Sequence, residues 1–164
     1  MKATKMKPLF LLIVCNLFFI SANLYSQKKE IKKSKIPTDV VNVLNKYIEI
    51  LTTSESVEAA AEKLIEIAGG NLLTPSMYAI TEDVKMYSLK KDWQNAQLYS
   101  YPVKITRCIL TPNGTDGYQE TYIKGDWYKI WIDKKLDERG MPAPISIIKP
   151  LNGEPKIISN IGSL

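Results

Sequence analysis

The spacing of apolar residues changes near Tyr101, and this change constrains the fold more than any other feature of the chain. Before it, apolar side chains recur every three or four residues, as on one side of a helix; after it, they alternate with polar ones, as along a strand. Helices that precede strands, instead of alternating with them, are typical of an antiparallel sheet covered on one face. We therefore predict an α+β fold, in a single domain over residues 37–164.

The helical part is predicted to contain three helices, over residues 38–51, 54–68 and 88–98. Ser54 and Ser88 are the expected N-caps of the second and third helices, since a serine hydroxyl accepts a hydrogen bond from a backbone N–H of the first turn. Residues 71–87 show no clear period, and both an earlier helix start at Thr81 and a short strand fit them.

The second part is predicted to form a curved, four-stranded antiparallel sheet, with strands at 103–110, 118–133, 145–148 and 157–158. Residues 112–117 contain both Asn-Gly and Asp-Gly, which are strong hairpin signals, so we expect the first turn there. Gly125 interrupts the long middle strand and is expected at a bulge or a tight turn.

This order of elements, with its long bulged middle strand, resembles the nuclear-transport-factor-like (cystatin-like) cone fold of many small exported bacterial proteins. The resemblance covers about residues 37–164 and implies helices packed into a strongly curved sheet; a cystatin-like sheet around one helix, or another α+β layout, is the alternative. The fold hosts enzymes and non-enzymes, so it decides no function. Its catalytic members often use an Asp–His pair or other acid–base residues deep in the cone, and this chain has no histidine.

The first 26 residues have the three-part layout of a cleaved signal peptide: early lysines, a short apolar run and then small or polar residues. We expect cleavage between Ser26 and Gln27, with Ala22 as the alternative site, and therefore a periplasmic or secreted protein without a membrane span after cleavage. Lipid attachment at Cys15 is disfavoured, because Val14 before it is not small.

The positive charge of the chain lies mostly at its N-terminus. Residues 27–36 form a lysine-rich segment that we expect to be a flexible tail, whereas residues 36–164 carry 14 basic and 16 acidic side chains. A nucleic-acid partner is therefore excluded, since it needs cations clustered on the folded surface.

The absence of histidine removes the commonest general base and most zinc, copper and haem sites, so we assign no catalytic residue, metal or cofactor. Cys108 is the single cysteine after the signal, and its strand-like surroundings predict a buried thiol over an intermolecular disulfide.

Two tryptophans and one arginine are the main candidates for binding. Trp127 and Trp131 lie on the strand face opposite an apolar set that should contact the helices (Tyr128, Ile130 and Ile132), and we expect them to be partly exposed interface or sugar-stacking residues. Packing on a sheet covered on both sides is the alternative. Arg107 shares its side of the strand with Ile105 and Ile109, so it could bind a carboxylate or phosphate, or form a structural ion pair.

Trp93 is the third aromatic candidate, because Asp92 beside it could have a raised pKa in an apolar pocket, as could Asp126 beside Trp127. Ordinary positions at a helix start and in a turn are the alternatives. The sequence thus predicts an exported, non-catalytic module that holds an unidentified ligand, glycan or envelope protein on its sheet. A sheet-mediated homodimeric scaffold, or a metal-free isomerase, lyase or hydrolase with Asp or Tyr in the cone, are the alternatives.

Overall fold

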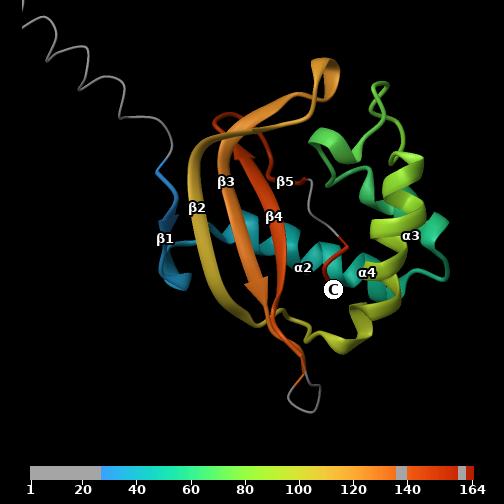
Figure 1. The fold of residues 1–164 in the computed structure, drawn as a ribbon, viewed down its shortest axis with the longest axis horizontal. Coiled ribbons are helices and arrows are strands. Elements are labelled where there is room, and N and C mark those ends of the chain that lie inside the picture. The colour runs from blue at the N-terminus through green and yellow to red at the C-terminus, as the bar shows by residue number, and fades with distance from the viewer. Residues whose placement is uncertain (1–26, 136–139, 159–161) are drawn as a thin grey trace, which may run out of the picture.

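A computed structural model describes residues 27–135, 140–158 and 162–164 of the chain. In it, helices pack against one face of a curved antiparallel sheet, which confirms the predicted single α+β domain (Figure 1). The predicted signal peptide and its cleavage site lie outside the described residues.

The sheet has five strands in the order β1-β2-β3-β4-β5, each antiparallel to its neighbours. Their bounds are Lys29–Glu30, Ile105–Asp116, Ile123–Ile132, Ala143–Pro150 and Lys156–Ile157. The strand beyond the predicted four is β1, which comes from the segment expected to be a flexible tail. Lys29 and Glu30 pair with Leu110 and Ile109 on β2, and Ile31 donates a 3.0 Å backbone hydrogen bond to Cys108. These backbone bonds fix the tail along the edge of β2.

The helices are α2 (Thr38–Thr53), α3 (Val57–Leu64) and α4 (Lys90–Asn95). Two predicted caps were wrong. Ser56, not Ser54, caps α3, where its Oγ accepts a 3.1 Å hydrogen bond from the N–H of Ala59. Ser88 lies inside a π-helical turn, Val84–Leu89, that leads directly into α4. Within residues 71–87, which the sequence left undecided, the helical run begins at residue 82. The alternative of an earlier helix start near Thr81 is therefore the correct one.

The main core lies between α2 and the sheet. Its strand residues are Cys108, Tyr128, Ile130, Ile132, Ala143, Ile145, Ile147 and Ile157, and α2 contributes Val40, Leu44, Tyr47, Ile48, Ile50 and Leu51. The predicted inward face of the middle strand is thus confirmed, and so is the buried thiol. Burial raises the pKa of Cys108 to about 11, because the thiolate would lose its hydration.

The glycine-containing turn signals were misplaced. Strand β2 continues to Asp116, and Pro112 and Asn113 form a bulge opposite β3, between the pairs Thr111–Trp127 and Gly114–Gly125. Asn113 has a φ of 53°, the left-handed conformation that an Asn-Gly turn and a bulge both use. The chain reverses at 117–122, where a strand was expected.

Gly125 lies within continuous β3 and not in a turn, and it belongs to the pair that closes the bulge, whose extra residue is on β2. A Cβ atom there would overlap the carbonyl oxygen of Lys149 on β4, so the close approach of two backbones explains the glycine. Among the described helices, none combines the length and the apolar character needed to cross a membrane.

Candidate functional site

The outer face of the sheet, defined as the side of β2, β3 and β4 that points away from α2, carries the two candidate tryptophans. Trp127, Lys129 and Trp131 alternate with the buried residues of β3 and are partly exposed. The pairing of β3 with β4 places Ser146 and Ile148 on this same face, and both are fully buried. The outer face is therefore covered toward β4 and open toward β2. The prediction of partly exposed tryptophans holds for the open part, and the alternative of a sheet covered on both sides holds for the part near β4.

A groove of about 380 Å³ lies on the open part of the outer face. Its lining residues are Lys28, Ile109, Thr111, Trp127, Lys129 and Trp131. They come from β2, from β3 and from the segment just before β1. The pairing of β1 with β2 thus brings Lys28 to the wall of the groove. The sequence predicted this residue to lie in a flexible tail.

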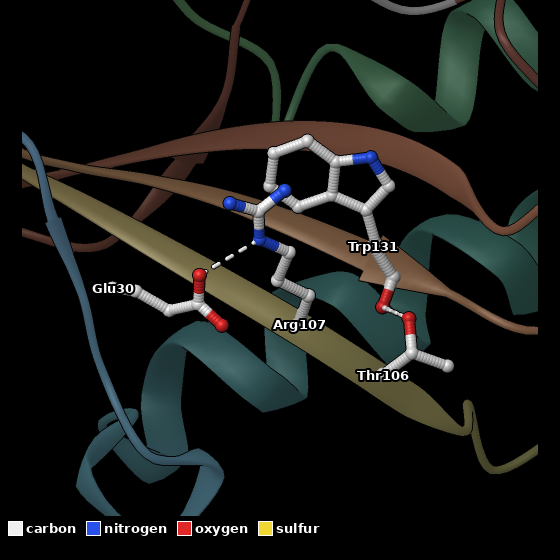
Figure 2. Close-up of polar contacts among 4 residues, drawn as sticks. All are labelled: Glu30, Thr106, Arg107 and Trp131. Atoms are coloured by element: carbon white, nitrogen blue, oxygen red, sulfur yellow. Dashed lines mark hydrogen bonds and ion pairs between the residues drawn. The ribbon is translucent and has the colours of Figure 1, made fainter.

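Arg107 does not line the groove itself but lies against Trp131, which does (Figure 2). Its guanidinium carbon is 5.0 Å from the centroid of the indole, and Lys129 Nζ is 5.4 Å from the same ring. Cations at this distance are attracted to the electron-rich ring face. The Nε of Arg107 also lies 3.0 Å from Glu30 Oε2, so the structural ion pair considered for this arginine is present and solvent-exposed.

A bulge in β2 explains why Arg107 reaches this position. Ile105 pairs with Ile132 and packs against the core, whereas Arg107 pairs with Trp131 on the outer face. The extra residue between them, Thr106, donates a 3.2 Å hydrogen bond from its hydroxyl to the carbonyl oxygen of Trp131 (Figure 2). The prediction that Arg107 shares a side with Ile105 was therefore wrong, since simple alternation stops at the bulge.

No family model, curated protein or solved structure matches this chain. The site is therefore assigned from its own geometry.

Trp93 lies apart from the outer face. Its indole packs against the core in the helical layer, and its Nε1 donates a 3.1 Å hydrogen bond to the carbonyl oxygen of Ser54. It lines a different groove, of about 370 Å³, near Glu58 and Lys90. The structure therefore brings together Arg107, Trp127 and Trp131 but not Trp93.

Asp92 is enclosed rather than placed at a pocket wall. It is 1 % exposed and accepts hydrogen bonds from Tyr47 Oη at 2.6 Å and from the backbone N–H groups of Gly162 and Leu164, each at 2.8 Å. Burial raises the pKa of this carboxyl, while the three hydrogen bonds oppose the rise. The raised pKa that we considered for Asp92 is present, but the group holds the C-terminal segment and no substrate can reach it. Asp126, by contrast, is exposed on β3.

Sequence reasoning missed a second surface, at the end of the sheet where β2 and β3 join. Met77, Tyr78, Tyr118 and Tyr122 are exposed there, on two loops linked by a 2.7 Å hydrogen bond from Asn71 to Asp116. The signal in the sequence that could have found this surface is the presence of Tyr78 and Tyr118 next to turn-forming residues. Within the described ranges, no cluster of three or more metal-ligating side chains occurs.

Proposed function

We propose that this protein is an exported, non-catalytic binding module of the cell envelope, which holds its ligand on the outer face of the sheet. The observation that carries the proposal is the groove lined by Trp127 and Trp131, with Arg107 stacked on the second ring. Tryptophan and arginine are the side chains that most often dominate binding energy at interfaces.

The chemistry of the groove supports binding over catalysis. It combines two broad aromatic surfaces with lysine ammonium groups from Lys28 and Lys129, and it offers no carboxylate among its lining residues. The buried carboxylate and phenol that could act as acid and base, Asp92 and Tyr47, are enclosed in the core. The metal-free isomerase, lyase or hydrolase is therefore the less favoured function.

The export component of the proposal rests on the sequence pattern of residues 1–26. Cleavage at Gln27 would leave a new N-terminus one residue from Lys28, which lines the groove. A ligand available in the periplasm or outside the cell, either a glycan, a small molecule or an envelope protein, would then meet this face directly.

Native mass spectrometry of the protein purified from its own cell envelope tests the proposal. We expect a chain beginning at Gln27 with a retained ligand or partner, and loss of that added mass in the Trp127→Ala/Trp131→Ala double variant. Trp93→Phe is the matched control and should retain the mass. A wild-type protein recovered bare, or equal retention by the double variant, would overturn the proposal. A mass of twice the chain, unchanged by the double variant, would favour the homodimeric scaffold.

A further inference from the structure

We infer that the ligand of the outer groove is an acidic carbohydrate, a sugar chain whose carboxylate groups bind Arg107 and the neighbouring lysines while its rings stack on Trp127 and Trp131. This inference rests on the proposed function and adds the chemical class of the ligand.

The cations of the groove favour an anionic ligand. Neither Lys28 nor Lys129 forms an ion pair within the described residues, although five other cations do so. Both lysines line a groove that has no acidic lining residue. The rest of the folded part is slightly acidic, so the positive charge is local. A short ligand with a few carboxylates fits this arrangement better than a long polyanion, which needs a continuous track of cations.

Arg107 provides a specific carboxylate site. Only its Nε is engaged by Glu30, at 3.0 Å, while the two terminal nitrogens of the guanidinium make no other hydrogen bond among the described residues. Arginine commonly holds a carboxylate through two parallel N–H donors. The contact with the Trp131 ring holds the guanidinium in place (Figure 2), and the Arg107 side chain stays half-exposed.

Glu30 binds the Nε of the same guanidinium, so its negative charge lies beside the terminal nitrogens that would receive the ligand carboxylate. Its ion pair with Arg107 is exposed, with side-chain exposures of 61 % and 50 %, and exposed pairs of this kind contribute little stability. A ligand carboxylate can therefore replace Glu30 at Arg107. The segment that carries Glu30 thus acts as a weak internal competitor for acidic ligands.

The aromatic spacing and the paired backbone favour a carbohydrate over a peptide. Four residues along β3 separate the Cα atoms of Trp127 and Trp131 by about 13 Å, so the rings can serve successive parts of one elongated ligand. The backbones of β2, β3 and β4 beneath the groove are hydrogen-bonded to one another, so a peptide lying across this face cannot pair with them. Beside the groove, an added strand could pair only along the edge of β2 beyond Leu110, where the pairing with β1 ends. Sugar rings need only apolar C–H faces for stacking and hydroxyl partners such as Thr111.

Calorimetric titration with trigalacturonic acid and with neutral galactotriose of the same linkage tests the inference. We expect the wild-type protein to bind the acidic sugar at least tenfold more tightly, and added salt to weaken only that binding. Arg107→Gln and Lys129→Gln should lower the affinity for the acidic sugar about fivefold to tenfold and leave the neutral sugar unaffected. Glu30→Gln should raise the affinity for the acidic sugar, and Lys63→Gln, an exposed control on α3, should change neither.

Different results would contradict the acidic charge of the ligand, its carbohydrate nature and the binding site itself. Equal affinities for the two sugars would overturn the acidic ligand and leave the proposed function standing. If a folded wild-type protein binds neither sugar, the inference that the ligand is a carbohydrate is wrong. Unchanged binding of both sugars to Trp127→Ala and Trp131→Ala would overturn the site itself, and with it the proposed function.

Discussion

The hydroxyl group of Tyr47 donates a 2.6 Å hydrogen bond to the carboxylate of Asp92, and both side chains are enclosed by protein. This contact links α2 to α4. The same carboxylate also accepts the backbone N–H groups of Gly162 and Leu164, so it ties the end of the described chain to the helical layer. Because three donors bind this carboxylate, its loss should lower the stability of the fold.

Replacing Asp92 by Asn should lower the free energy of unfolding by about 1–3 kcal/mol. The amide offers one acceptor oxygen and brings two N–H donors against groups that are themselves donors. Urea denaturation of the variant measures the loss. Tyr47→Phe, which removes a single donor, is the control and should cost about 1 kcal/mol. Wild-type stability in Asp92→Asn would show that the carboxylate does not hold the C-terminal segment.

The ion pair between Asp39 and Lys149 should make stability depend on pH. Lys149 Nζ lies 2.5 Å from Asp39 Oδ2, and this hydrogen bond lowers the pKa of Asp39 below its ordinary value of 3.8. The contribution is therefore fully present above the ordinary pKa and is lost as the pH falls through the lowered pKa in the folded state. Both side chains are about one-third exposed, so solvent screening limits the contribution to less than about 1 kcal/mol.

Comparison of wild type with Asp39→Asn by urea denaturation, between about pH 7 and about pH 2, tests this prediction. The wild-type protein should be the more stable at neutral pH, and the difference should shrink in acid. A difference that does not vary with pH would contradict the assignment of the lowered pKa to this pair.

The thiol of Cys108 should be unreactive in the folded protein. It is fully buried on β2, and its raised pKa of about 11 leaves little thiolate at neutral pH. Labelling with iodoacetamide near pH 8 should be slow in buffer and fast in guanidinium chloride. Rapid labelling under native conditions would show that β2 opens readily.

Two glycines of the sheet should differ in their tolerance of alanine. At Gly125 the added Cβ meets the backbone carbonyl of Lys149, which cannot move without separating β3 from β4, so we expect a loss of about 1–3 kcal/mol. At Gly114 it would lie 2.7 Å from the Cβ of Trp127, which is a smaller overlap than the one at Gly125 but moves Trp127 together with the β3 backbone that carries its Cβ. Gly114→Ala should therefore weaken ligand binding more than it weakens the fold. Equal stability losses would contradict this difference.

The hydrophobic periods of the sequence predicted the fold class and the faces of β3 because burial follows period in regular elements. They did not locate the bulges at Thr106 and Asn113, since a bulge changes the side that later residues occupy without changing composition. Arg107 was therefore assigned to the same side as Ile105, whereas it pairs with Trp131 on the outer face.

The remaining parts of the site depend on tertiary pairing. Nothing in the lysine-rich composition of residues 27–36 predicts that Lys29 and Glu30 pair with β2, and this pairing is what places Lys28 at the groove. Similarly, helical spacing identified Trp93 as an aromatic residue on one helix face, but its distance from the outer face follows from how α4 packs.

The stability of Trp131→Ala, measured together with its ligand retention, decides whether this residue binds the ligand or supports the fold. We predict a loss of at most about 1 kcal/mol in the free energy of unfolding, because Trp131 is partly exposed, together with loss of the retained ligand. Truncation of a core tryptophan costs about 3–5 kcal/mol. A loss of that size, or full ligand retention by a stable variant, would show that Trp131 supports the fold and does not bind the ligand.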